Sequence, residues 1–254
     1  MTKTYDDYDL DQHDKYELLL TAADGEVELS PKAFAELPRT VVCMDERARV
    51  AGPVIGLAGS GILATDEQRA RFVAKLEAAG IDQAALQVTH HESCGAAGLF
   101  VEANPHLETT PAVAAERAAR ELKTATASEV EVTKIGWSDD SHHEAVGHPD
   151  HHHARVIYID FTGRFDPDVA GLPDGFLISA AYSPDDEYLQ REVTLAQDIA
   201  AGPHGRGEKY FREHSPLLLV IVSDQPESAE LALGNSLHRR PDITRILYVK
   251  PPKN

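Results

Sequence analysis

Cysteine is scarce in this chain, with two residues among 254, at positions 43 and 94. Two thiols cannot form a disulfide framework, which excludes the small secreted folds that depend on several such bonds. Long apolar runs are also missing. The longest run, at 217–222, has the length of a buried strand and falls far short of the ~20 residues that a membrane-spanning helix needs.

Positively charged residues are also few. The chain has 24 Lys and Arg residues against 42 Asp and Glu residues, so the formal net charge is −18. A surface of this kind repels phosphates, which argues against a nucleic-acid partner. The first 16 residues are polar and acidic and do not resemble a signal peptide. We therefore expect a cytoplasmic protein without a membrane partner.

Short apolar segments alternate with segments of helical periodicity, and this pattern predicts an α/β fold with a mostly parallel central sheet flanked by helices. We expect an N-terminal helical arm at 1–38 and one α/β domain at 39–254, with a His-rich insert at 138–153 and a divergent C-terminal α/β extension. No internal repeat is visible. Strands are expected at 39–44, from 53, and at 85–89, 130–137, 155–161, 175–182, 217–223 and 243–249; helices are expected at 14–22, 30–37, 65–79, from 95, and at 111–126, 185–201 and 226–237.

Both cysteines stand beside other residues that bind metals. Cys43 belongs to Cys43-Met-Asp45-Glu-Arg47 at the end of one expected strand, and Cys94 belongs to His91-Glu-Ser-Cys94 at the end of another. Open α/β sheets place their ligand sites at the carboxyl ends of strands, so both segments are expected to face one cleft. Two thiolates and one imidazole form a three-ligand zinc site that leaves the fourth tetrahedral position open. The sequence therefore predicts a catalytic zinc site.

The pattern Cys-x-Asp-x-Arg followed by His-x-x-Cys-Gly resembles the β-class carbonic anhydrases, and the doubled histidine at 90–91 is similar to their branch of COS and CS2 hydrolases. The resemblance covers residues 38–100, with a weaker likeness at 154–165. It implies a carbonate dehydratase, a zinc lyase that reversibly hydrates CO2 to bicarbonate, with one Zn2+ per chain on Cys43, His91 and Cys94. It also implies that Asp45 and Arg47 form a hydrogen-bonded catalytic pair beside the zinc, and that the chain forms a homodimer or a larger homo-oligomer.

Two other functions stay open. The same scaffold could hydrolyse COS or CS2, which would need a narrower and more apolar entrance to the site. The turn LAGSG at 57–61 stands where the family has an asparagine-bearing turn, so the family pattern does not define the shape of the substrate pocket here. The chain could instead be a non-catalytic zinc-binding or metal-handling protein that works through the six histidines between 142 and 153. Gly, Pro and Asp interrupt these histidines, so a surface loop that binds metal only adventitiously is the favoured interpretation. His90 is interpreted as a strand-end histidine bonded to backbone, with a proton relay as its alternative.

Overall fold

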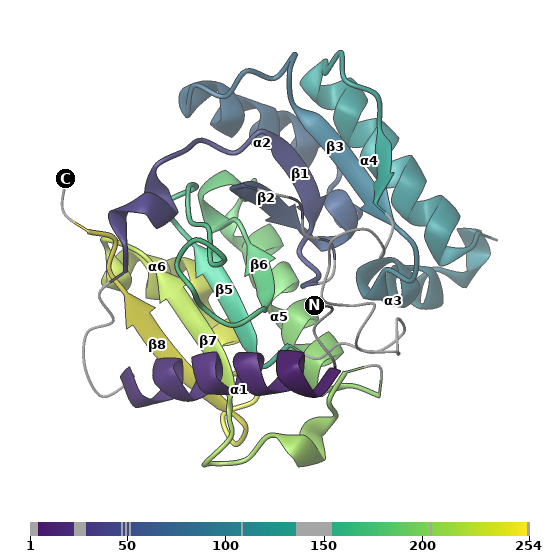
Figure 1. Ribbon diagram of the computed structural model, residues 1–254. Coiled ribbons are helices and arrows are strands. Elements are labelled where there is room, and N and C mark those ends of the chain that lie inside the picture. The colour runs from purple at the N-terminus through teal and green to yellow at the C-terminus, as the bar shows by residue number, and fades with distance from the viewer. Residues whose placement is uncertain are drawn as a thin grey trace.

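The computed structural model describes residues 5–22, 29–46, 48, 50, 52–107, 109–135, 154–203 and 205–252. Within these ranges the predicted α/β class with parallel strands is confirmed (Figure 1). The six helices are α1 (Tyr5–Ala22), α2 (Asp66–Ala78), α3 (Gly95–Ala103), α4 (Pro111–Thr126), α5 (Asp186–Ala201) and α6 (Pro226–Leu233). The eight strands are β1 (Thr40–Cys43), β2 (Val54–Leu57), β3 (Gln87–His91), β4 (Thr133–Ile135), β5 (Val156–Asp160), β6 (Phe176–Ile178), β7 (Leu217–Val222) and β8 (Thr244–Val249).

The described strands form two four-stranded parallel sheets, which is consistent with the predicted parallel sheet of an α/β fold. The first sheet has the order β2-β1-β3-β4 and the second has the order β6-β5-β7-β8. The second sheet therefore repeats the strand order of the first. The first half of the chain holds β1 to β4 and the second half holds β5 to β8. In each half the second strand is followed by a short 3-10 turn, at Ala58–Ser60 and at Ala180–Tyr182, before the next long helix. This duplication of topology was not visible in the sequence.

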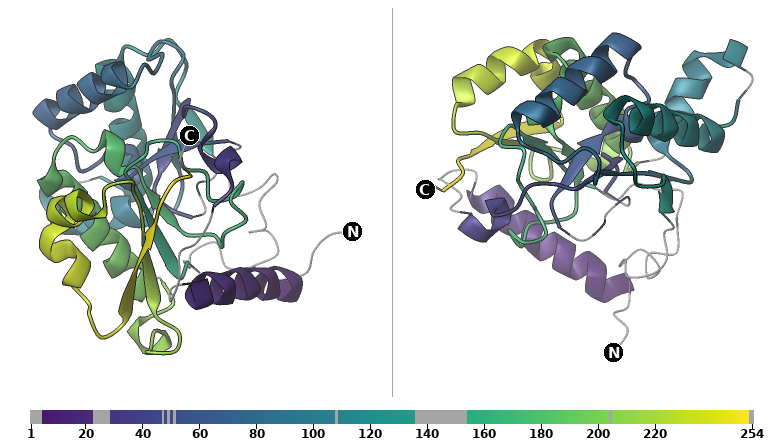
Figure 2. Two further views of the ribbon diagram at one scale, coloured as in Figure 1. Left: turned by 90° about the vertical axis from the view of Figure 1, so that its left-hand side faces the viewer. Right: turned by 90° about the horizontal axis from the view of Figure 1, so that it is seen from above.

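Helices α2, α4, α5 and α6 lie on one side of the sheets, and α1 lies on the other side against the second sheet (Figure 2). Strand β7 is covered on both faces. Its residues Leu217, Leu219 and Ile221 belong to the core under α5 and α6, whereas Leu218 and Val220 belong to the core that includes Tyr16 of α1. Burial on both faces explains why this strand is apolar at every position.

Local sequence signals set several helix ends. Thr65 and Gln68 form a capping box at the start of α2, and the Asp185 side chain accepts a hydrogen bond from the Tyr188 amide at the start of α5. The predicted helix at 30–37 is only the 3-10 turn Pro31–Phe34, while α1 begins at Tyr5 rather than near residue 14. The His-rich insert at 138–153 lies outside the described residues.

The two sheets meet where the edge strands β2 and β6 approach one another. The amide of Ser179 donates to Gly56 O at 3.0 Å, and the Gly56 amide donates to Ser179 Oγ at 2.9 Å. The Leu177 amide donates to Met44 O at 2.9 Å, directly after β1. A Cβ added at Gly56 would lie 1.9 Å from Leu177 O, so a residue without a side chain is required at this junction. No helix in the described ranges has the length and apolar character needed to cross a membrane.

Candidate metal centre

The carboxyl ends of β1 and β3 bring the predicted ligands together. Cys43 is the last residue of β1, His91 is the last residue of β3, and Cys94 is the N-cap of α3. Strands β1 and β3 are parallel neighbours, so their ends reach the same edge of the sheet. One ligand atom from each of the three residues lies within 4.8 Å of the other two, and the two Sγ atoms are 3.7 Å apart.

This group is closed off from solvent, because Cys43, His91 and Cys94 are each at most 3% exposed. Both cysteines are free thiols. The hydrogen bond between the two thiols, together with burial, raises the pKa of the Cys43 thiol well above its usual value. A cation bound between the sulfurs would displace protons from them and stabilise the thiolates. The group could therefore bind a metal ion, and two sulfurs with one imidazole nitrogen are a donor set that suits zinc.

The loop between His91 and Cys94 orients the imidazole. His91 Nδ1 lies 2.6 Å from the carbonyl oxygen of Glu92, to which it donates a hydrogen bond when protonated. This contact selects the tautomer in which Nε2 carries the lone pair that a metal would take. Ser93 has a φ of 50°, in the left-handed region that residues other than glycine rarely adopt. Strain of this kind clusters at functional sites, where the surrounding structure holds it in place.

Asp45 adjoins the group without belonging to it. Its carboxyl group is buried, and Oδ2 lies 3.8 Å from Nε2 of His91. The three close ligands among the described residues are Cys43, His91 and Cys94 alone, so Asp45 occupies a position next to the ligands rather than among them. Arg47, the predicted partner of Asp45, lies outside the described residues.

Two residues near the site were missed or left open by the sequence. Glu46 is buried and its Oε1 accepts a hydrogen bond from the Ala154 amide at 3.4 Å, which joins the end of β1 to the start of the second half. His90 precedes His91 in β3 and so points to the opposite face of the sheet. Burial lowers the pKa of His90, while Glu116 of α4 acts in the other direction. The role of His90, as a strand-end histidine or as a proton relay, stays a prediction.

The second half carries no equivalent group among the described residues. Asp160 ends β5 as Cys43 ends β1, Val222 ends β7 as His91 ends β3, and Gln225 is the N-cap of α6 as Cys94 is the N-cap of α3. Of these three residues in the second half, Asp160 alone is of a type that commonly ligates metals. Equal topology therefore does not give equal chemistry.

The Asp160 carboxylate is committed to its own loop. Oδ1 accepts hydrogen bonds from the amide and the hydroxyl of Thr162, at 2.8 and 2.6 Å, and Oδ2 accepts one from the Phe165 amide at 3.2 Å. Burial raises the pKa of Asp160, against the effect of these hydrogen bonds. The carboxyl group thus stabilises the turn after β5 and is not directed toward an open site.

The fold and the site define an α/β protein with duplicated topology and one buried Cys-His-Cys group that could hold a metal ion. No family model, no curated protein and no solved structure matches this chain.

Proposed function

We propose that this protein is a zinc enzyme of the β-carbonic anhydrase type, which reversibly hydrates CO2 to bicarbonate. The observation that carries the proposal is the buried group of Cys43, His91 and Cys94, whose ligand atoms lie within 4.8 Å of one another. The position of Asp45 beside this group adds support, since the resemblance in sequence expects a carboxylate there. A homo-oligomeric state and CO2 as the substrate belong to the same proposal.

In this mechanism zinc would supply a Lewis acid that lowers the pKa of a bound water toward neutrality. Cys43, His91 and Cys94 would hold the ion and leave its fourth position open. The buried Asp45 carboxylate would accept a hydrogen bond from the reacting water and orient its lone pair toward the carbon of CO2. Arg47 is assigned by the resemblance alone to hold Asp45 in its ionised form.

Zinc content and stopped-flow CO2 hydration, measured on the same samples, test the proposal. We expect about one zinc per chain in the wild-type protein and a loss of zinc in Cys43→Ser, because the variant lacks one thiolate ligand. Asp45→Asn should keep its zinc and lose roughly 10–100-fold in activity, because the residue acts beside the metal rather than on it. Asp224→Asn is the control, since this exposed residue follows β7 in the half without a metal group.

Zinc-loaded wild-type protein that hydrates CO2 no faster than buffer would contradict the carbonic anhydrase assignment. Assays with COS and CS2 on those samples would then show whether the site acts on a related linear molecule. Several weakly bound metal ions that persist in Cys43→Ser would instead favour the metal-handling alternative. Each outcome therefore selects one of the three functions.

A further inference from the structure

Helix α5 belongs to the second half of the chain, and one of its carboxyl groups forms a hydrogen bond with the backbone of the first half. Glu192 of α5 is completely buried, and its Oε1 accepts a hydrogen bond from the Ala58 amide at 2.5 Å. Ala58 directly follows β2 and begins the 3-10 turn Ala58–Ser60, here called the 58–60 turn. Because burying a carboxyl group is costly, the contact calls for an explanation beyond packing.

The 58–60 turn lies between the two elements that carry the cysteines. On one side, the residue before the turn accepts a hydrogen bond from the Met44 amide at 3.0 Å, directly after Cys43. On the other side, the turn contacts α3, whose N-cap is Cys94, and Gly59 lies close enough to Ala96 that an added Cβ would be 3.7 Å from Cβ of Ala96. A displacement of this turn would therefore move both thiols.

The backbone of the 58–60 turn is strained, although the Gly61 and Ile62 amides donate to Ala58 O at 2.9 and 3.1 Å. Gly59 and Ser60 have φ values of 51° and 53°, and Gly61 after them has 94°. Such a conformation is unfavourable for serine and persists only when neighbouring groups hold it. The hydrogen bond from the Ala58 amide to the buried carboxyl group of Glu192 is one interaction that stabilises this conformation.

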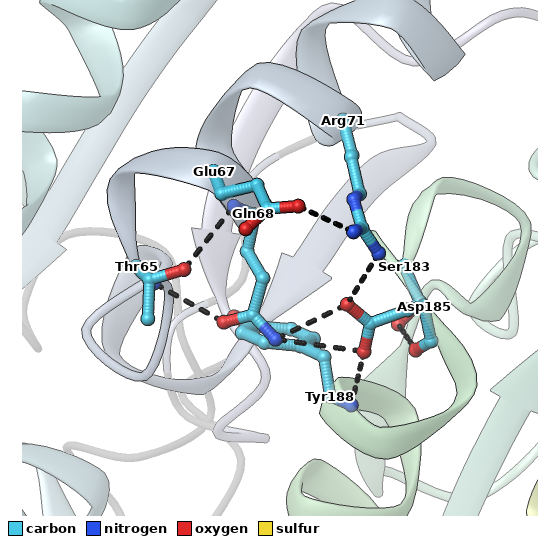
Figure 3. Close-up of polar contacts among 7 residues, drawn as sticks. All are labelled: Thr65, Glu67, Gln68, Arg71, Ser183, Asp185 and Tyr188. Carbon is cyan, nitrogen blue, oxygen red and sulfur yellow. Dashed lines mark hydrogen bonds and ion pairs between the residues drawn. The ribbon is translucent and has the colours of Figure 1, made fainter.

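Helix α5 also forms hydrogen bonds with the chain just beyond the turn. Asp185, its N-cap, accepts hydrogen bonds from Gln68 and Arg71 of α2, at 3.2 and 3.3 Å (Figure 3). Arg191 donates to Leu63 O at 2.7 Å. The contacts of both arginines are exposed, where hydrogen bonds and ion pairs contribute little. Among these polar contacts, the one made by the buried carboxyl group is the nearest in sequence to Cys43.

We propose that Glu192 is a positioning residue for the metal centre: by accepting a hydrogen bond from the Ala58 amide, it holds the 58–60 turn and thereby sets the separation of Cys43 and Cys94. The inference rests on the proposed metal site, and Glu192 acts without touching the metal or the substrate. Burial raises the pKa of Glu192 to about 8, so the group is mostly neutral at pH 7. Glutamine would therefore keep both the shape and the acceptor oxygen.

Cobalt binding tests this role without any reference to catalysis. Co2+ serves as the probe because its absorption reports thiolate ligation and the geometry around the ion. The variants are Glu192→Met, which keeps the length but lacks the oxygen acceptor, Glu192→Gln, and Glu187→Met as an exposed control on the same helix. We expect Glu192→Met to bind Co2+ roughly tenfold more weakly with an altered spectrum, and the other two to match the wild type.

Circular dichroism and thermal unfolding establish that Glu192→Met is folded, and Glu192→Leu replaces it if it is not. Wild-type affinity and spectrum in the folded apolar variant would overturn the inference. An equal loss in Glu192→Gln would also overturn it, because the acceptor oxygen would then not be the property that matters. Wild-type protein that binds no cobalt would overturn the metal site together with the inference, so the two failures are distinguishable.

Discussion

At the scale of single residues, Glu192 combines complete burial with an ionisable group. Burial raises its pKa to about 8, against the hydrogen bond from Ala58 and the charge of Arg191, which lower it. Tyr188, one turn earlier on α5 and also buried, has a pKa well above its usual value, because of burial and because Glu192 lies nearby. The folded chain therefore favours the neutral forms of both groups.

Glu192→Gln should change how stability depends on pH. The folded wild type keeps the Glu192 proton up to about pH 8, whereas the unfolded chain releases it near the ordinary value of 4.5. Between these values the folded state binds the extra proton, so this group makes the free energy of unfolding fall as pH rises. Relative to the variant, the wild type should lose stability from about pH 4.5 to about pH 8, on the order of a few kcal/mol.

Urea unfolding of metal-free wild type and Glu192→Gln at several pH values measures this difference. Other titrating groups, including the cysteines and His91, are common to both proteins and largely cancel. A difference in unfolding free energy that stays constant across this interval would contradict the raised pKa.

At the scale of elements, the end of α4 shows a local backbone cost. Ala127 is the C-cap of α4 and has a φ of 52° and a ψ of 30°. Helices commonly end on a residue in this left-handed conformation, and that residue is usually glycine because it has no Cβ to clash. Helix α2 differs, since its C-cap Ala79 has a φ of −81° and the left-handed position is taken by Gly80.

Ala127→Gly should therefore raise the free energy of unfolding by about 1 kcal/mol, because it relieves the left-handed strain at an exposed position. Ala79→Gly is the matched control. It changes a residue that is already in the right-handed region, so we expect no gain or a small loss. Urea unfolding of both variants measures the two effects, and a similar response at both positions would contradict the backbone explanation.

At the scale of the whole molecule, two halves with the same strand order meet at their equivalent edge strands, β2 and β6. One half presents the Cys-His-Cys group, and the other supplies the helix that bears Glu192. The half without the metal group is therefore in contact with the connection that follows β2. Disturbing the junction between the sheets should weaken the entire fold.

Gly56→Ala tests this junction. The added Cβ would lie 1.9 Å from the carbonyl oxygen of Leu177, which is backbone and cannot move aside cheaply. We expect a loss of about 3 kcal/mol or more in the free energy of unfolding, at or beyond the upper range for overpacked sites. Gly98→Ala in α3 is the control, because nothing lies within 4 Å of its added Cβ and alanine favours the helix. Equal stability of the two variants in urea would contradict a tight junction.

The sequence by itself determined the features that depend on neighbouring residues. The apolar run of β7 predicted a buried strand, and Thr65 and Asp185 marked the starts of two helices. The motifs around Cys43 and Cys94 predicted that Cys43, His91 and Cys94 meet at strand ends, and these three side chains do lie together. Periodicity, capping and strand-end position depend on residues that are near one another in the sequence, so the sequence alone can predict them.

Only the tertiary structure decided how the strands are shared between two sheets and what surrounds the metal group. The duplicated strand order arises from pairing between strands that are far apart in the chain, which local patterns do not specify. The bond between Ala58 and Glu192 joins residues 134 positions apart, and the tight approach at Gly56 involves Leu177 from the other half. Such contacts depend on how whole sheets pack against each other. The metal-ligand motifs depend only on where each strand ends, which the local sequence indicates.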